Sequence, residues 1–272
     1  MIASIQNSLI KTIRKLHQTK YRQQQQLCLL EGTHLITEAL ASNYPLITVC
    51  YTHSWQNRYR ELWQHIEQQA SRAEVVSEDV LKAIATTVNP DGIVAVAPGK
   101  PGSPLMLPHS GLGFALETVQ DPGNLGTIIR TAAAAGVEGL WVSADSTDLD
   151  HPKVLRASAG AWFRLPMAVS PNLPDLVRQC REQGIQVVAT SALADTTYWQ
   201  IDWCRPSLVL LGNEGAGLSP ELAAQADRST SIPMAGRVES LNVALCAALI
   251  AYEACRQRQK IAKKIAQSPV GD

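Results

Sequence analysis

One segment of the chain reads Ser207-Leu-Val-Leu-Leu-Gly-Asn-Glu-Gly-Ala-Gly-Leu-Ser-Pro-Glu221. A wholly apolar strand over 207–211 runs into a glycine-rich loop, and Ser219, Pro220 and Glu221 supply the cap, first-turn proline and first-turn acid of a helix. Open α/β sheets bind ligands in such loops, at the carboxyl ends of their strands. The glycine order is G-x-x-G-x-G, not the G-x-G-x-x-G of dinucleotide binding, and no Walker lysine follows. Taken alone, the loop fits a plain tight turn as well as a ligand site.

A second motif, Glu117-Thr-Val-Gln-Asp-Pro-Gly-Asn-Leu-Gly-Thr-Ile-Ile-Arg130, precedes this stretch. Residues 121–123 form a turn at a strand end, and Asn124 is predicted to cap a helix that ends at Gly136. Arg130 follows Asn124 by about a turn and a half, so we expect it to face the mouth of the sheet. Taken alone, an arginine on an alanine-rich helix is more typical of a surface residue or an ion pair.

The third motif is Ile232-Pro-Met-Ala-Gly-Arg-Val-Glu-Ser-Leu-Asn-Val-Ala-Leu-Cys-Ala-Ala-Leu-Ile-Ala-Tyr252. Ser240 is a good N-cap for a long helix. Small and apolar residues cover nearly every side after it, which predicts a buried first half. A buried amide is costly unless it is hydrogen-bonded, so Asn242 is unusual there, and a satisfied core asparagine is the simpler interpretation.

The rest of the chain alternates strands with helices, which predicts an α/β fold with a mostly parallel sheet in its second part. Residues 98–111 contain four prolines and three glycines and are predicted to be a linker. This linker separates a domain over 1–97 from one over 112–265. The first domain has a predicted basic helix over 8–25, apolar runs at 27–30, 47–51 and 93–97, and helical patterns near 33–42, 56–70 and 78–86. In the second we expect strands at 113–119, 138–143, 185–190, 207–211 and 229–232, and helices at 125–135, 172–183, 219–226 and 240–262.

The formal net charge is zero, with 24 basic and 24 acidic side chains in 272 residues. Nucleic-acid-binding proteins are usually basic, so this balance argues against such a partner. The charges are segregated, however. Residues 1–26 and 256–264 contain ten bases and no acid, which leaves −9 over residues 27–255. Basic ends can attract phosphates within about a Debye length, although solvated helix faces explain them equally well.

The six cysteines are scattered without a CxxC pair, which argues against a zinc site or a disulfide scaffold. We expect reduced thiols and no metal, with His151 structural rather than a ligand. No stretch is apolar enough for a signal peptide or a membrane span. These features predict a soluble, cytoplasmic protein.

Taken in order and spacing, the three motifs resemble the signatures of the SpoU (TrmH-like) branch of the SPOUT methyltransferases. The resemblance covers about 112–258 and includes Lys153-Val-Leu-Arg-Ala-Ser-Ala-Gly160. Leu29-Leu-Glu-Gly-Thr-His34, after the basic helix, resembles the small α/β RNA-binding domain that often precedes SpoU domains. The resemblance implies methylation of a ribose 2′-hydroxyl in RNA with S-adenosylmethionine as the cofactor. It also implies a homodimer and a deep trefoil knot, which general folding rules would not predict.

The resemblance assigns roles to residues. It implies that the adenosylmethionine pocket is lined by Gly212, Ile232, Met234 and Leu241. Arg130 takes the catalytic position with Asn124 beside it, and the polar positions Glu214, Ser240 and Asn242 orient Arg130 and the ribose. Free deprotonation of a guanidinium with a pKa above about 12 is costly, so we expect Arg130 to stabilise an alkoxide or grip a phosphate. The phosphate-contact candidates in the first domain are Lys11, Arg14 and Lys15.

Three alternatives remain at this point. The two-domain layout favours ribosomal RNA as the substrate, but transfer RNA would need the same chemistry. A non-catalytic RNA-binding relative is disfavoured by the intact Asn124, Arg130 and Asn242. A nucleotide-cofactor oxidoreductase would need a G-x-G-x-x-G near a first strand and an acid about 20 residues later, and the sequence has neither.

Overall fold

The computed structural model describes the chain except for residues 101–104, 237, 239 and 268–272, and the side chains of 262–267. The chain divides into two compact units. Unit 1 comprises Met1–Pro101 and Asp148–Arg164, and unit 2 comprises Gly102–Thr147 and Leu165–Asp272. Within the described part of the chain, no helix is long and apolar enough to cross a membrane.

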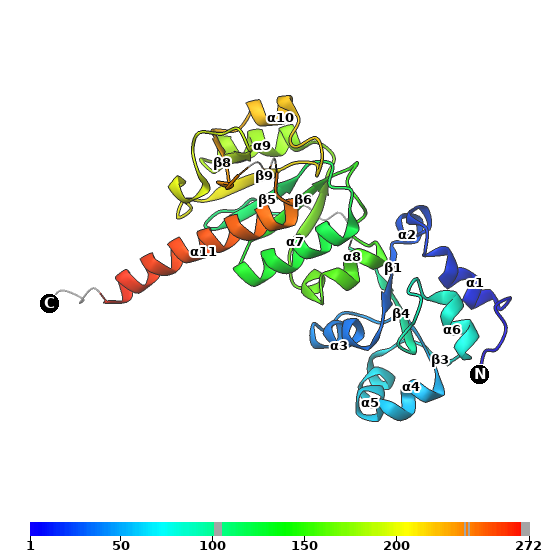
Figure 1. Cartoon of the computed structure of the whole chain (residues 1–272). Helices are drawn as coiled ribbons and strands as arrows, with labels where there is room; N and C mark the ends of the chain where they lie inside the picture. The colour runs from blue at the N-terminus through cyan, green and yellow to red at the C-terminus, as the bar shows by residue number, and fades with distance from the viewer. Residues whose placement is uncertain (101–104, 237, 239, 268–272) are drawn as a thin grey trace. The chain divides into compact units, whose positions relative to one another are not determined.

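Unit 1 is an α/β unit built on a four-stranded sheet with the order β1-β4-β2-β3 (Figure 1). Strand β4 is antiparallel to β1 and β2, whereas β3 is parallel to β2. The short β3 has the sequence Ala-Glu-Val and was not predicted, because no apolar run signals it. The strands are β1 (Leu27–Glu31), β2 (Thr48–Tyr51), β3 (Ala73–Val75) and β4 (Ile93–Pro98), and the helices are α1 (Ser8–Lys15), α2 (Thr19–Gln25), α3 (Thr33–Ala41), α4 (His53–Arg58), α5 (Arg60–Gln69), α6 (Glu78–Ile84) and α8 (Pro152–Ala157).

The basic helix predicted over 8–25 is two helices, because a buried arginine bonds the chain between them. The Arg22 guanidinium donates to the carbonyl oxygens of Leu16 and His17 over 2.8 and 3.0 Å, just after α1 ends. Its other N–H groups donate to Thr19 Oγ1 and twice to Asp148 Oδ2. All five donors are satisfied and the side chain is only 1% exposed. Arg22 is therefore a structural residue and is not free to bind phosphate.

Residues 148–164 pack within unit 1, although the predicted second domain includes them. This segment contains α8 and a short 3₁₀ helix over Ala161–Phe163, neither of which was predicted. Three ion pairs hold it to the unit: Asp148–Arg22, Arg156–Glu31 and Arg164–Glu38. The predicted boundaries at 97 and 112 otherwise stay a prediction, since residues 101–104 of the linker lie outside the described residues.

Unit 2 contains a six-stranded sheet with the order β10-β8-β9-β5-β6-β7, in which every described pairing is parallel. Helices α7 and α11 lie on one side of this sheet and α9 and α10 on the other (Figure 1). The predicted strands and helices of this part are confirmed with small shifts. The four-residue β7 and a short 3₁₀ helix over Tyr198–Gln200 were not predicted. The strands are β5 (Leu112–Leu116), β6 (Gly139–Ser143), β7 (Met167–Ser170), β8 (Gln186–Thr190), β9 (Ser207–Leu211) and β10 (Arg228–Thr230), and the helices are α7 (Pro122–Ala135), α9 (Leu173–Glu182), α10 (Pro220–Ala224) and α11 (Val243–Gln267).

Two predicted helix caps are wrong by a few residues. Asp121, not Asn124, caps α7, because its carboxylate accepts from the Asn124 N–H over 2.9 Å and Pro122 follows as the first helical residue. Asn242, not Ser240, caps α11, since its Oδ1 accepts from the N–H groups of Ala244 and Leu245. These shifts free the Asn124 side chain for other partners and give the Asn242 amide a helix end to bond.

The first half of α11 is buried on one side only. Ala247, Ile250 and Ala251 are buried on the side that packs against α7. The prediction that nearly every side is buried is wrong for a second side, which leaves large apolar residues 40–54% exposed: Leu245, Leu249 and Tyr252. We call these three residues the α11 apolar face.

Candidate active site

The motifs meet where the connections of the unit 2 sheet reverse direction. Strands β5 and β9 are parallel neighbours, but the chain leaves β5 toward β6 and leaves β9 toward β10, so the two connections run toward opposite edges of the sheet. Such a switch point opens a crevice outside the carboxyl ends of the strands. The loop before α7, the glycine-rich loop after β9 and the start of α11 all reach this point.

A directional hydrogen-bond relay joins the three motifs. The Glu214 Oε1 atom accepts from Asn124 Nδ2 over 3.0 Å, and Asn124 Oδ1 accepts from Asn242 Nδ2 over 2.8 Å. Because Asn242 Oδ1 faces the N–H groups at the start of α11, its amino group must face Asn124. The Asn124 amino group must then face the carboxylate. The relay therefore fixes both amide orientations, and it brings three of the predicted site residues into contact with one another.

The Glu214 carboxylate is held in its ionised form. Its two oxygens also accept from the N–H groups of Gln120 and Asp121, over 3.3 and 3.1 Å. Partial burial would raise the pKa of Glu214, but these bonds and the one from Asn124 outweigh it and hold that pKa below its usual value. A fixed negative charge therefore lies beside the crevice.

The glycine-rich loop folds back tightly on the end of β9. Asn213 and Gly217 exchange backbone hydrogen bonds of 3.0 and 2.9 Å, and Asn213 Oδ1 accepts from the N–H groups of Gly215 and Ala216. A Cβ atom on Gly212 would lie 2.1 Å from the Gly217 carbonyl carbon, so only glycine fits there. The loop ends where Ser219 caps α10, as predicted.

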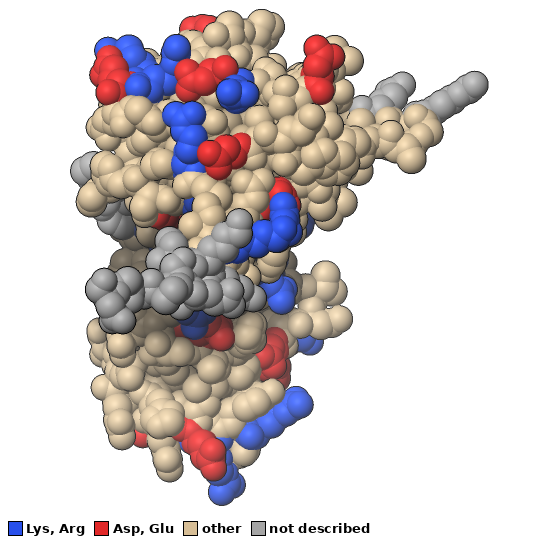
Figure 2. Space-filling model, turned by 90° about the vertical axis from the view of Figure 1, so that its left-hand side faces the viewer, with Lys and Arg blue, Asp and Glu red and all other residues tan. Residues whose placement is uncertain are grey.

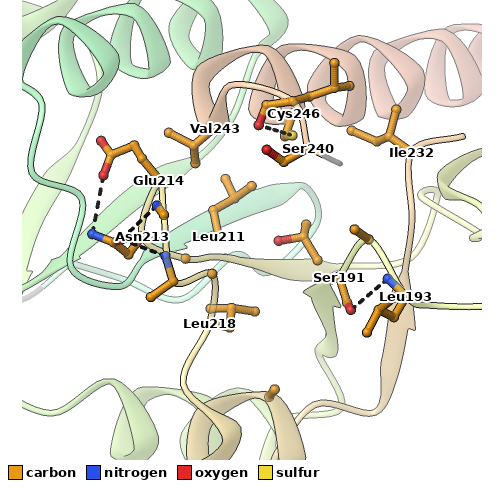
Figure 3. Close-up of a pocket in the computed structure, with 18 of the residues that line it drawn as sticks. Ser191, Leu193, Leu211, Asn213, Glu214, Leu218, Ile232, Ser240, Val243 and Cys246 are labelled. Atoms are coloured by element: carbon orange, nitrogen blue, oxygen red, sulfur yellow. Dashed lines mark hydrogen bonds between the residues drawn. The ribbon is translucent and has the colours of Figure 1, made fainter. Parts of the chain in front are cut away.

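A cavity of about 410 Å³ lies between this loop and the start of α11 (Figure 3). All four predicted cofactor residues line it: Gly212, Ile232, Met234 and Leu241. Glu214 and Ser240 line it too. In Figure 3, Leu211 and Val243 lie on the loop and α11 sides of the same space. Among the residues that the structure describes, the walls are mainly apolar and include the acidic residue Glu214, which suits a largely apolar ligand that carries a positive charge.

The sequence did not predict one wall of the cavity, which residues 190–193 form. They comprise the last residue of β8 and the three residues after it, and β8 is the parallel neighbour of β9, so the carboxyl ends of both strands lie at the same side of the sheet. The sequence could have indicated this wall only through the adjacency of β8 and β9, and that adjacency cannot be known without the order of the strands in the sheet. Cys246 of α11 also lines the cavity and was not singled out.

Arg130 lies apart from the relay. It is exposed on α7 and makes no hydrogen bond or ion pair with the residues that the structure describes. Six helical residues separate it from Asn124, which places it about 9 Å further along the axis and on a different side of the helix. Within one chain, the predicted catalytic arginine is therefore not joined to the other predicted site residues.

The predicted RNA contacts of unit 1 are exposed. Lys11, Arg14 and Lys15 all lie on the solvent side of α1, while Ile10 and Ile13 of that helix are buried. The Lys15 ammonium lies 5.5 Å from the centre of the Tyr21 ring. The candidate basic surface of unit 1 is this exposed side of α1, because Arg22 of the same basic segment is buried. Figure 2 shows a different face of the molecule, on which Lys and Arg lie beside Asp and Glu rather than in one patch of a single sign.

The second basic segment is only partly available. The Arg256 guanidinium bonds the Glu253 carboxylate, and Arg258 donates to the Trp203 carbonyl oxygen over 2.8 Å. The side chains of Lys263 and Lys264 lie outside the described residues.

His151 is structural, as predicted: its Nδ1 accepts from the Lys153 N–H at the start of α8. No group of three metal-ligating side chains exists among the described residues.

A cavity at the switch point of a parallel sheet, beside a hydrogen-bonded carboxylate, defines the class of protein. It is an α/β enzyme that holds a small organic cofactor at the carboxyl ends of its strands. The profile of the SpoU rRNA Methylase family matches residues 111–252, and that of the MRM3-like substrate binding domain matches residues 7–95. The chain belongs to the SpoU rRNA methylase family, and the resemblance seen in its motifs is confirmed.

Relatives match over nearly the whole length. An uncharacterized tRNA/rRNA methyltransferase of Synechocystis is 46% identical over 94% of both chains. The 23S rRNA (guanosine(2553)-2′-O)-methyltransferase RlmP of Bacillus subtilis is 34% identical over 92% of this chain and 97% of its own. The crystal structure of an AdoMet-bound rRNA methyltransferase from Sinorhizobium meliloti superposes with a TM-score of 0.84 at 35% identity, covering 94% of this chain and 97% of that one.

Proposed function

We propose that this protein transfers the methyl group of S-adenosylmethionine to a ribose 2′-hydroxyl of ribosomal RNA. The observation that carries the proposal is the cavity at the switch point, lined by Gly212, Ile232, Met234 and Leu241 and flanked by the relay. Adenosylmethionine is a sulfonium cation with an adenosyl group, which matches apolar walls beside the Glu214 carboxylate. The AdoMet-bound relative and the ribose 2′-O-methyltransferase RlmP support the cofactor and the reaction.

When bound, the cofactor supplies a methyl group that the sulfonium already activates. The chain's own residues must then align the ribose hydroxyl and stabilise the negative charge that forms on its oxygen. Arg130 supplies that charge stabilisation, or grips the adjacent phosphate, without giving up a proton. The relay residues Asn124, Glu214 and Asn242 keep the floor of the site fixed, and Ser240 presents a hydroxyl at the cavity wall.

We infer that two copies of the chain complete each site. Arg130 is exposed and lies apart from the relay of its own chain, so an arginine from the partner subunit can fill the catalytic position. The α11 apolar face provides a surface for such a dimer, because exposed leucines and a tyrosine in one stripe are a typical interface. The arginine and the apolar face lie on the two packed helices α7 and α11, which favours one interface serving both.

We also propose that the chain is knotted around the cavity. After β10, the Ser231 N–H bonds the Thr196 carbonyl and the Tyr198 N–H bonds the Ser231 carbonyl, both in the connection between β8 and β9. The chain then continues into α11, which packs on α7. Helix α7 follows β5, and β8 and β9 lie between β10 and β5 in the sheet. A return past this connection is the kind of path that a trefoil knot requires.

Ribosomal RNA is proposed over transfer RNA because RlmP matches across both units and acts on 23S rRNA. Unit 1 then supplies substrate contacts through Lys11, Arg14 and Lys15, in line with the match to a substrate binding domain. The logarithm of the RNA-binding constant falls linearly with the logarithm of the salt concentration, and each phosphate contact that is lost should make this slope shallower by about 0.7–0.9. The bacterial rRNA-modifying relatives favour a cytoplasmic location.

The test replaces Arg130 with alanine and measures two quantities. Transfer of tritiated methyl groups to ribosomal RNA from cells lacking the gene should be lost, while calorimetric adenosylmethionine binding stays within about twofold. Arg178→Ala is the matched control, because Arg178 is an exposed arginine of α9 that ion-pairs with Asp175. Equal loss of transfer and cofactor binding in Arg130→Ala would contradict the assignment. Binding of NAD in place of adenosylmethionine would favour an oxidoreductase, and cofactor binding without transfer to any RNA a non-catalytic relative.

A further inference from the structure

Thr118 has an unusual backbone conformation next to the relay. Its φ angle is +54°, in the left-handed region, although threonine is β-branched. A β-branched residue is a genuine outlier there, and such conformations persist only where surrounding bonds impose them. Thr118 follows β5 and precedes the loop that carries Gln120 and Asp121.

Bonds from two neighbouring strand ends impose this conformation. The Thr118 N–H donates to Ser143 Oγ and its hydroxyl donates to Asp145 Oδ2, both over 2.8 Å. Ser143 ends β6 and Asp145 lies in the loop after it. On the other side, the Thr118 carbonyl accepts from Asn213 Nδ2 of the glycine-rich loop over 2.8 Å. Every polar group of Thr118 is therefore bonded, and the residue ties together the loops after β5, β6 and β9.

The bonds continue into the site. Gln120 Nε2 donates to the Asp145 carbonyl oxygen over 2.7 Å, and the Val119 N–H donates to Ser146 Oγ. The next two backbone N–H groups, of Gln120 and Asp121, are the ones that bond Glu214. The direction of the chain at Thr118 thus decides whether these N–H groups reach the carboxylate that anchors Asn124.

We propose that Thr118 is a positioning residue for methyl transfer, and that the bond from its hydroxyl to Asp145 holds the loop whose amides bind Glu214. This inference rests on the proposed function and adds two residues, Thr118 and Asp145, that the motifs did not assign to the site. The Ser143 and Thr118 hydroxyls hold the pKa of Asp145 below its usual value, so the acceptor is a carboxylate at neutral pH.

The experiment compares variants of the full-length protein. Thr118→Val removes the hydroxyl and keeps the branched shape, Thr118→Ser keeps the hydroxyl, and Asp145→Ala removes the acceptor. Thr37→Val is the control, since Thr37 is an exposed threonine of α3 whose hydroxyl bonds only the Thr33 carbonyl. The probe is ribosomal RNA from cells lacking the gene with tritiated adenosylmethionine, and rates are normalised to cofactor-binding sites titrated by calorimetry.

Thr118→Val and Asp145→Ala should each lower kcat by about 10- to 100-fold, the scale of a misplacement near 1 Å. The KM for RNA and the affinity for adenosylmethionine should change less than about threefold. The double variant should lose no more than either single one, because both remove the same bond. Thr118→Ser should restore at least half of the kcat.

The outcomes separate the inference from the proposed function. A Thr118→Val enzyme with unchanged kcat, or additive losses in the double variant, would overturn the inference alone. Losses confined to the amount of folded, cofactor-binding protein, with normal kcat per site, would also overturn it. Absence of transfer by the unmodified enzyme would overturn the proposed function and the inference with it.

Discussion

Replacing Asn124 with aspartate should disable the relay while keeping its shape. The change removes the hydrogen bond to Glu214 and puts a second carboxylate where a donor lay 3.0 Å from Oε1. Loss of a bond to a charged group costs about 1.5–3 kcal/mol. The repulsion between the two carboxylates cannot exceed about 3.7 kcal/mol at pH 7, because one of them would then take up a proton. That figure is the free energy of protonating a carboxyl with an ordinary pKa of about 4.3 at pH 7. The two costs do not add fully, because a carboxyl that takes up the proton again donates a hydrogen bond to the other carboxylate. The net cost is therefore about 2–4 kcal/mol, which corresponds to an activity loss of about 30- to 1000-fold.

The pH dependence distinguishes this mechanism from a general disturbance of the site. Like charges raise the pKa of a carboxyl pair, so the shared proton binds as the pH falls and the repulsion disappears. The ratio of kcat/KM between the unmodified enzyme and Asn124→Asp should therefore shrink several-fold from pH 8 to pH 6. Asn124→Ala loses the bond without adding charge, and its ratio should stay constant. Equal ratios for Asn124→Asp at both pH values, or nearly full activity, would refute the relay as described.

Three further changes have definite expected results. Gly212→Ala should weaken adenosylmethionine binding at least about tenfold by calorimetry, because the new Cβ collides with the backbone of the returning loop. Gly215→Ala is the control and should bind normally, since its new Cβ would lie 3.6 Å from Asn213 Oδ1, an ordinary contact distance. Arg22→Ala should lower the unfolding free energy of unit 1 by about 3–5 kcal/mol in calorimetric melts, because it removes a buried guanidinium and leaves the largely buried Asp148 carboxylate without its ion-pair partner. Loss of the exposed Arg72–Glu74 pair should cost under about 1 kcal/mol. Leu245→Asp should give monomers in sedimentation experiments and lose methyl transfer; an active monomer would contradict the two-copy site.

The fold of unit 2 was largely predictable because its strands are fully apolar runs bounded by turn residues. Strand β9 was predicted at its observed bounds, 207–211, since it is buried throughout and a glycine ends it. Strand β7 was not, because four residues with one exposed position give no usable period. The break after α1 depends on Arg22, whose carboxylate partner is 126 residues away in sequence. Local propensity contains no information about such a partner.

The site could be predicted where a motif specifies both the identity of a residue and the part of the fold in which it lies. Asn124, Glu214 and Asn242 were each expected at the site and form the relay, and the four predicted cofactor residues line one cavity. Arg130 was expected beside Asn124 but lies apart from the relay of its own chain. Ser219 was correctly predicted as a cap, but the caps of α7 and α11 were not, because two candidates lie within three residues of each other at each helix start and propensity alone does not rank them. The place of residues 190–193 in the cavity wall follows from the strand order, and the proposed role of Thr118 follows from its backbone angle. Neither could be predicted, because strand order and backbone angles are known only from the three-dimensional structure.

We propose that this protein methylates ribose hydroxyls of ribosomal RNA through Arg130. Both parts of this proposal are tested by mapping 2′-O-methyl groups in ribosomal and transfer RNA from cells that lack the gene, complemented with either the unmodified protein or Arg130→Ala. We expect a site in ribosomal RNA to lose its methyl group, to regain it with the unmodified protein and to stay unmodified with Arg130→Ala. An unchanged ribosomal RNA pattern, or recovery of the methyl group with Arg130→Ala, would contradict the claim.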